Sequence, residues 1–280
     1  EGSTGQDPRQ YPGMAVLQLF YFSNLAHDYF YALGFDEAAG NFQNDNFGKG
    51  GEGSDAILAD EQDGRVTNNA NYRPTPDGVR PRMQYGIFTQ GTATRTDDRD
   101  SALSGQVVFH EYGHGVTTRV VGGPDTVSCL SSGQGAAMGE GWSDYFAVSY
   151  FNEPRTGRYL LEKEEAGIRR HAYNTHPGNF SNLGDEGFLP HNDGELWAVM
   201  LFDLRQKLGA TVADKLVYEA LRITPCRPTM IEARNALVTA EQNLFQKQHE
   251  RGLWEVLAAR GFGDSAASSG QGEFDSITFT

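Results

Sequence analysis

The segment His110-Glu111-Tyr112-Gly113-His114 constrains the fold most, because it places two histidines four residues apart within a stretch of helical pattern. Four residues turn an α-helix by roughly 400°, so both imidazoles project from one face, one above the other. At that spacing they can bind one metal ion, and Glu111 can act as a general base toward water. The alternative is a chance pair of surface histidines among the 7 in the chain.

A catalytic zinc ion takes three protein ligands and keeps one open position, so the chain must bring a further ligand to this helix. The best candidate is Glu140, which lies in the segment 138–144 of a second predicted helix. Asp144 follows one turn later on the same face, where it can accept the free N–H of a zinc-bound imidazole. The alternative is a carboxylate in the first turn of that helix and an aspartate on its surface.

The chain contains two regions of different pattern. In the first, an amphipathic helix over 14–33 precedes a Gly-, Asn- and Asp-rich stretch with short extended candidates at 56–58 and 83–88. From residue 104 on the pattern is helical, and we expect helices at 105–121, 136–151, 195–208, 212–223, 229–247 and 253–260.

These elements predict an N-terminal lobe with strands, loops and a helix over 1–121, which ends in the metal-binding helix. A mainly helical lobe follows over 122–263. The last stretch, 264–280, is rich in Ser and Gly at its start, so we expect a flexible tail with a short strand at 274–280.

The charge balance excludes several classes of partner. Lys and Arg number 23 against 37 Asp and Glu, for a formal net charge of −14. A field of that sign repels phosphate backbones and anionic lipid surfaces, so we expect neither a nucleic-acid nor a membrane partner. The longest apolar run, 196–202, is much shorter than a membrane span of about 18 residues or more. Residues 1–9 lack a signal-peptide pattern, so the chain was either never exported or has been processed.

Two features leave alternatives open. Cys129 and Cys226 can form one bridge or remain two buried thiols, and they are too few for a cysteine-ligated zinc site. The acidic stretches 55–63 and 97–100 can bind calcium through carboxylate oxygens or can be solvated loops, and they lack the regular EF-hand spacing.

Several motifs resemble the fungalysin metallopeptidases, which share the thermolysin-like fold. The resemblance rests on residues 110–115, on Gly122-Gly123-Pro124 and on residues 139–144. Further matching blocks lie at 35–43, 46–51, 67–72, 191–197 and 225–229, so that the similar region reaches from about residue 15 to about residue 263. The resemblance implies an α+β, thermolysin-like zincin with its active-site cleft between the two lobes.

The resemblance also implies a role for each matching residue. It makes His110, His114 and Glu140 the zinc ligands and Glu111 the general base, in agreement with the spacing argument. His191 resembles the histidine that donates a hydrogen bond to the developing oxyanion, with a polar loop histidine as the alternative.

The resemblance further implies how substrate is held. Asn69 and Ala70 resemble the edge-strand residues that pair with the substrate backbone. Arg169 resembles the arginine beside the thermolysin specificity pocket, although Arg170 fits that position nearly as well. Thermolysin places a tyrosine between its second histidine and third ligand, whereas none occurs between residues 114 and 140 here. Another donor must serve, and Tyr173 together with His191 is our candidate.

The implied protein is a secreted, extracellular endopeptidase with one catalytic zinc ion, made as a precursor that its own propeptide inhibits. We expect a monomer that cleaves internal bonds of proteins or peptides with a metal-activated water, favouring a bulky apolar residue after the cut. An exopeptidase with the same zinc centre would need an anchor for a free chain terminus, and none is evident. A non-catalytic binding protein would be expected to have lost Glu111 or a ligand.

Overall fold

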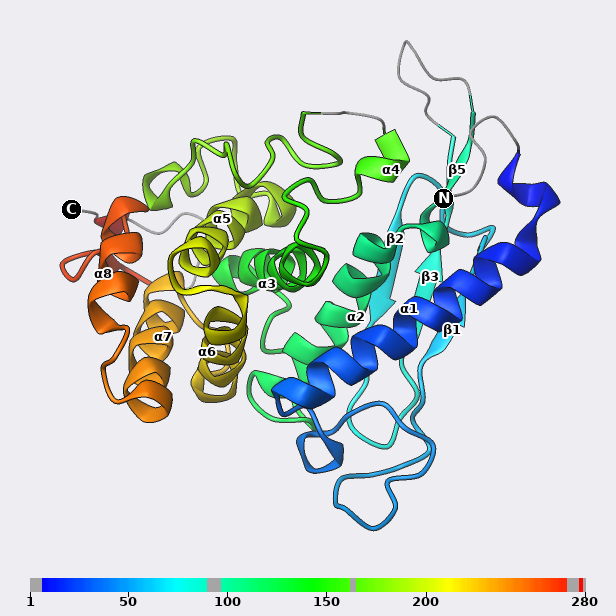
Figure 1. Ribbon diagram of the computed structural model, residues 1–280, viewed down its shortest axis with the longest axis horizontal. Helices are drawn as coiled ribbons and strands as arrows, with labels where there is room; N and C mark the ends of the chain where they lie inside the picture. The colour runs from blue at the N-terminus through cyan, green and yellow to red at the C-terminus, as the bar shows by residue number, and fades with distance from the viewer. Residues whose placement is uncertain (1–6, 90–96, 162–164, 271–276, 279–280) are drawn as a thin grey trace.

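The computed structural model describes residues 7–89, 97–161, 165–270 and 277–278, and combines helices with short strands (Figure 1). The α-helices are α1 (Pro12–Leu33), α2 (Gly105–Val120), α3 (Gly133–Phe151), α4 (Arg158–Leu161), α5 (Pro190–Leu208), α6 (Ala210–Ile223), α7 (Met230–Phe245) and α8 (Glu250–Ala259). The strands are β1 (Leu58–Asp60), β2 (Ala70–Arg73), β3 (Arg82–Tyr85), β4 (Ile87–Phe88), β5 (Arg99–Asp100), β6 (Ala267–Ser268) and β7 (Ile277–Thr278). The expected mixture of a strand-containing region and a helical region is confirmed.

Local sequence signals set most helix ends. Helix α1 ends where Gly34 adopts a φ of 118°, which a glycine tolerates without steric cost. Helix α7 begins after Thr229, whose side chain forms a capping box with Glu232. Helix α5 begins five residues earlier than the periodicity predicts, at Pro190, because proline at the first position is preorganised for a helix. His191 therefore lies in the first turn of a helix rather than in a loop.

The sheet is small and mixed. Its strand order is β1-β3-β2, with β1 parallel and β2 antiparallel to β3, so β2 lies at an edge. The extended candidate at 83–88 is divided into β3 and β4 at Gly86, where a Cβ would lie 2.3 Å from the Val66 carbonyl oxygen. Beyond this break, β4 pairs with β5 instead of continuing the sheet.

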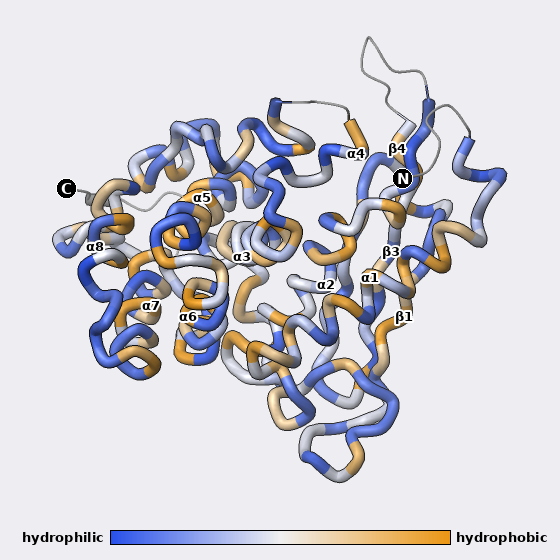
Figure 2. Tube along the Cα trace, in the orientation of Figure 1, coloured by the Kyte–Doolittle hydropathy of each residue, from blue (hydrophilic) through white to orange (hydrophobic). Residues whose placement is uncertain are grey.

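Figure 1 shows the sheet, α1 and α2 grouped on one side of the molecule and α5 to α8 on the other, with α3 between them. One hydrophobic core joins both groups, and Trp142 of α3 meets Trp197 of α5 edge to face at 5.7 Å between ring centroids. Figure 2 shows hydrophobic and hydrophilic stretches alternating along the helices, as expected for helices that bury one face. The zinc-motif helix α2 packs against α3, so both predicted ligand-bearing helices belong to this core.

The structure decides one point that the sequence left open. Cys129 and Cys226 form a disulfide that joins the loop before α3 to the loop before α7. In the described part of the predicted tail, Gln134 of α3 donates hydrogen bonds to Ser268 Oγ and the Gly270 carbonyl. Strand β7 coincides with part of the expected strand at 274–280, whereas residues 274–276 and 279–280 lie outside the described residues.

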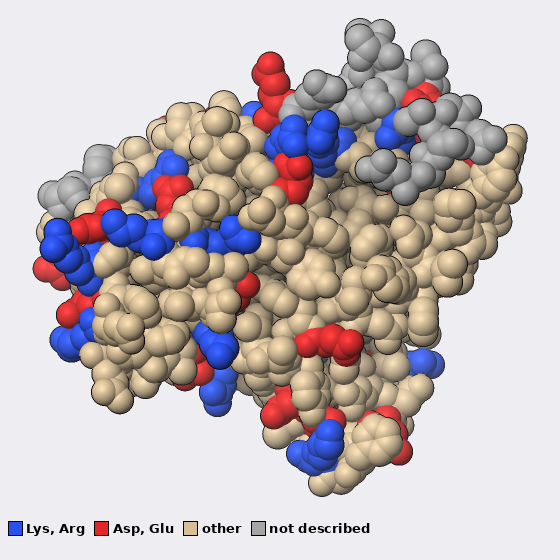
Figure 3. Space-filling model, viewed as in Figure 1, with Lys and Arg blue, Asp and Glu red and all other residues tan. Residues whose placement is uncertain are grey.

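The surface carries charges of both signs. Figure 3 shows acidic and basic side chains lying next to each other on the visible face. Within the described ranges, none of the helices combines the length and apolar character that crossing a bilayer requires.

Candidate metal centre

Helix α2 carries the two motif histidines on its buried side. His110 is 6% exposed, and the ring centroids of His110 and His114 lie 4.6 Å apart. Their Nε2 atoms are 3.0 Å from each other. Two converging nitrogens, one on the buried His110 and one on the half-buried His114, differ from a chance pair of surface histidines.

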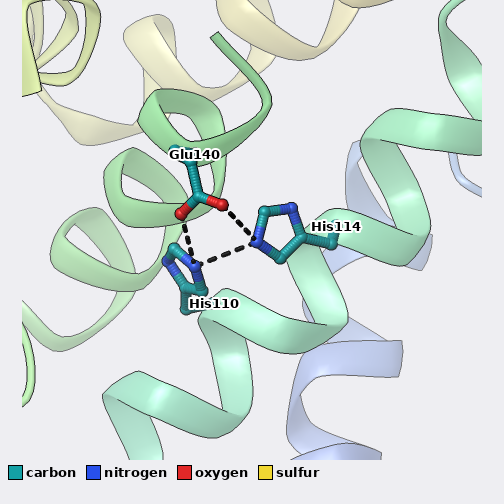
Figure 4. Close-up of side chains that lie close together, drawn as sticks. All are labelled: His110, His114 and Glu140. Carbon is teal, nitrogen blue, oxygen red and sulfur yellow. Dashed lines mark hydrogen bonds and ion pairs between the residues drawn. The ribbon is translucent and has the colours of Figure 1, made fainter. Parts of the chain in front are cut away.

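Helix α3 adds the third predicted ligand. One Glu140 carboxylate oxygen lies 3.3 Å from His110 Nε2, and the other lies 3.5 Å from His114 Nε2 (Figure 4). The three donor atoms all lie within 4.8 Å of one another, and no other such group of His, Cys, Asp or Glu occurs among the described residues. Glu140 Oε2 is buried and has no hydrogen-bond partner. Two imidazole nitrogens and a carboxylate that converge in this way fit a zinc ion.

A close crossing of α3 and α5 brings His191 to this group. Gly194 has no side chain to separate the helices, and a Cβ there would lie 2.5 Å from the Ala137 carbonyl and 2.8 Å from Glu140 Cβ. His191, one turn earlier on α5, consequently has its Nε2 atom 3.3 Å from Glu140 Oε2. Its side chain is 62% exposed, so it can also face a bound molecule.

Asp144 lies behind the candidate ligands and connects three side chains, those of His110, Arg169 and Tyr173. Its Oδ1 atom is 2.7 Å from His110 Nδ1, which orients the ring so that Nε2 points into the site. Arg169 donates two hydrogen bonds to the same carboxylate, at 2.5 and 2.9 Å. Although burial acts in the opposite direction, Arg169 and His110 hold the pKa of Asp144 far below its usual range.

The general-base candidate occupies an apolar position. Glu111 is 5% exposed, and burial raises its pKa to about 7 in the metal-free protein. Burial likewise lowers the pKa of His114 to about 4, which favours the neutral imidazole that a metal requires. A carboxyl group with a pKa near neutrality suits both proton uptake and proton release.

A cleft of about 440 Å³ passes over this cluster. The predicted residues Asn69, Ala70, Glu111, Arg169 and His191 all line it. Between Arg169 and Arg170, which the sequence could not separate, the structure places Arg169 in the cleft and Arg170 against α5.

Tyr173 does not line the cleft, contrary to its predicted role as a second donor to substrate. Its side chain is 1% exposed and its hydroxyl donates to Asp144 Oδ2. This placement makes Tyr173 a support for the Asp144 carboxylate, because a tyrosine buried at that point needs a partner for its hydroxyl.

Sequence reasoning missed part of the cleft wall. Val107, Leu160 and Ile168 line it, and so does Thr156, whose buried hydroxyl has no hydrogen-bond partner. The spacing of Val107 could have been used, since it lies on α2 one turn before the metal motif. No local pattern distinguishes the other three, which come from the loop and short helix after α3.

Most of the described carboxylates in the acidic stretches have protein partners, whereas Glu61 Oε2 is buried without a hydrogen-bond partner. Asp55 pairs with Arg119, Asp60 pairs with Arg82, and Asp97 pairs with Arg99. These three aspartates therefore have basic partners within the chain.

Comparisons with known proteins agree with the geometry. The family model described as "Fungalysin metallopeptidase (M36)" matches residues 2–266. Extracellular metalloproteinase mep of Aspergillus flavus is 35% identical over 299 residues, which cover 95% of this chain and 46% of that protein. Extracellular metalloproteinase 2 of Trichophyton tonsurans is 35% identical over 292 residues, covering 92% and 45%. The chain thus spans about half the length of these relatives.

The fold itself is similar to a solved structure. The precursor of protealysin, a metalloproteinase from Serratia proteamaculans, superposes with a TM-score of 0.60 at 14% sequence identity. The match covers 94% of this chain and 81% of that one. At this identity the likeness concerns the fold alone, and it confirms the expected thermolysin-like architecture.

Proposed function

Because the chain belongs to the fungalysin metallopeptidase family, we propose that it is a zinc-dependent endopeptidase that hydrolyses internal peptide bonds. The observation that carries this proposal is the convergence of His110, His114 and Glu140 beside the buried Glu111 in an open cleft. All four groups that metal-assisted hydrolysis requires of the protein are present in one place. This argues against a non-catalytic relative, which would be expected to lack one of them.

Each residue of the site has a separate task in the proposed reaction. A zinc ion, when bound by His110, His114 and Glu140, would supply a Lewis acid that polarises the scissile carbonyl and acidifies water. Glu111 takes a proton from the attacking water and later delivers it to the leaving amine. His191 donates a hydrogen bond to the oxyanion that develops on the carbonyl.

The cleft suits an extended peptide. Ala70 and Asn71 of the edge strand β2 line it, and β2 pairs with β3 on its other side. An extended substrate could therefore add to β2 through main-chain hydrogen bonds, which need no particular side chain. Binding of backbone along an open cleft favours internal cleavage over cleavage at a chain end.

The apolar part of the cleft supports a preference at the cut. Val107, Leu160 and Ile168 lie along the same cavity as Arg169, the predicted partner of a substrate carbonyl. A bulky apolar side chain just after the scissile bond would bury its surface against these residues.

The relatives suggest the setting of the enzyme. Those compared above are named extracellular metalloproteinases, which supports secretion of this protein, and the structural neighbour is a precursor, which supports inhibition by a propeptide. An oxidising exterior is also compatible with the Cys129–Cys226 disulfide. A monomer that acts on protein or peptide substrates remains part of the proposal.

Metal analysis combined with a peptide assay tests the proposed function. We expect about one zinc ion per chain and cleavage of an internally quenched peptide with both ends blocked. 1,10-Phenanthroline should abolish cleavage, and added zinc should restore it. Zinc-loaded protein that cleaves only peptides with a free end would contradict the endopeptidase assignment, and protein that binds no zinc would contradict the metal centre.

A further inference from the structure

His191 lies in the first turn of α5, directly after Pro190. The N-cap residue of this helix, Leu189, has no side-chain capping bond, and its backbone N–H donates to Asp193 Oδ2 at 2.8 Å. The first turn of a helix has backbone groups without intrahelical partners and is prone to fraying. Because hydrogen-bond donation to an oxyanion depends on geometry, motion of this turn would weaken the interaction.

Arg170 contacts this turn at several points. Its Nη2 atom donates a 2.6 Å hydrogen bond to the carbonyl of Asn192, the residue next to His191. Its backbone N–H and Nε atoms lie 3.2 and 3.4 Å from Glu195 Oε1, one turn further along α5. The guanidinium group and the backbone N–H of Arg170 thus hold the first two turns of α5, which include His191.

The carboxylate that receives these bonds is itself held rigidly. Glu195 is 1% exposed, and its other oxygen lies 2.9 Å from His176 Nε2. The Gly178 backbone N–H donates to Nδ1 of that ring, so Nε2 must carry the proton and donate to Glu195. A buried carboxylate with fixed donors on both sides gives Arg170 a stationary partner.

Arg170 also follows directly after a residue of the metal site. Arg169 binds the Asp144 carboxylate, which in turn contacts His110. Two consecutive arginines therefore extend to different helices, one toward the ligand-supporting Asp144 of α3 and one toward the His191 turn of α5. Because Arg169 and Arg170 are adjacent, the contact that orients His110 through Asp144 is joined by one peptide bond to the contact that holds the turn of His191.

We propose that Arg170 is a positioning residue that holds His191 at the oxyanion position through Asn192 and Glu195. This inference rests on the proposed peptidase function. An ordinary surface ion pair would not have this consequence, and the contact of Arg170 with the exposed Glu186, at 3.3 Å, is of that weak kind. The bonds to the Asn192 carbonyl and the buried Glu195 carry the positioning.

A double-mutant cycle in the zinc-loaded enzyme tests the coupling. Arg170→Gln should lower kcat by between about tenfold and 100-fold, with KM within about twofold and zinc content unchanged. In the His191→Ala background the same substitution should change kcat by less than about twofold, because its effect passes through the missing side chain. Arg222→Gln, which removes an exposed pair with Glu219, is the control and should leave all parameters unchanged.

Two results would overturn the proposal: a full decrease in kcat that persists without His191, or an Arg170→Gln enzyme that matches wild type. Should that variant fail to fold, Arg170→Lys, which keeps the charge but cannot reach both partners at once, should show a smaller loss of kcat that also disappears without His191.

Hydrogen–deuterium exchange separates this inference from the proposed function. Arg170→Gln should speed amide exchange over residues 189–195 and leave exchange in α3 unchanged. Unchanged exchange over 189–195 would overturn the positioning role even in an active enzyme. A wild-type protein that binds zinc without cleaving peptides would contradict the peptidase function alone, since the exchange result does not depend on activity.

Discussion

At the residue scale, Glu111 differs from an ordinary glutamate because the fold buries it beside His110, which we propose as a zinc ligand. Replacing it by Gln keeps the size of the side chain and removes the group that accepts a proton. We expect Glu111→Gln to retain zinc and to lose peptide cleavage by a factor of roughly 10² to 10⁴. Metal content and cleavage of a quenched peptide should be measured on the same preparation.

His114→Ala provides the contrast for that experiment. Removal of a ligand should lose both zinc and activity, whereas removal of the base should lose activity alone. A zinc-loaded Glu111→Gln protein that cuts at the wild-type rate would show that another group takes the proton.

A second prediction at the residue scale concerns zinc affinity after substitution of Asp144. Its carboxylate holds the Nδ1 side of His110 and receives Arg169, so Asp144→Asn weakens the orientation of both. We expect zinc affinity to fall by roughly 10- to 100-fold, the usual effect of losing such a hydrogen bond behind a ligand. Competition with a zinc-binding dye measures the affinity. The exposed Asp125→Asn variant is the control, and equal affinities in both variants would contradict the role of Asp144.

At the element scale, the crossing of α3 and α5 places Glu140 next to His191. Gly194→Ala would put a Cβ 2.5 Å from a backbone carbonyl, and backbone cannot move aside cheaply. We expect the free energy of unfolding to fall by about 1–3 kcal/mol, as for other overpacked sites, and cleavage to fall as the helices separate. Urea unfolding should be measured in the Glu111→Gln background, where self-digestion does not occur.

Gly13→Ala is the matched control for this substitution. Gly13 also lies in a helix, α1, but nothing lies within 4 Å of a Cβ there. That variant should be neutral or slightly more stable, since alanine favours helix more than glycine does. If both alanine variants unfold at the same urea concentration, the close crossing does not limit stability.

Helices were more predictable than strands at this scale. The cores of α1, α2 and α6 follow from apolar residues at helical spacing, which is a local property. The start of α5 was misplaced, because its first turn is polar and begins at Pro190 rather than at an apolar residue. The break between β3 and β4 was not predicted either, since it depends on the close approach of a distant carbonyl to Gly86.

At the scale of the whole molecule, the disulfide connects the loop before α3 to the loop before α7, which are far apart in sequence. Cys129 and Cys226 are separated by 97 residues, so the bridge restricts the unfolded chain considerably. We expect Cys129→Ser combined with Cys226→Ser to lower the free energy of unfolding by about 2–4 kcal/mol. Urea unfolding in the Glu111→Gln background measures this loss, and an unchanged midpoint would contradict it. Zinc binding should persist, because neither cysteine contacts the three ligands.

The amino-acid sequence by itself determined the chemistry of the site. The spacing of His110 and His114 specified two nitrogens on one helix face, and the residues around Glu140 specified a second helix with a carboxylate. Both statements concern residues within a few turns of each other, where helix geometry alone sets the distances.

The tertiary structure decided everything that depends on how separate elements meet. It placed Tyr173 behind Asp144 instead of in the cleft, divided the roles of Arg169 and Arg170, and paired the two cysteines. Neighbouring arginines look equivalent in sequence because their surroundings come from other helices. Packing of α3 against α5 supplies those surroundings, and such close packing depends on side chains that are distant along the chain.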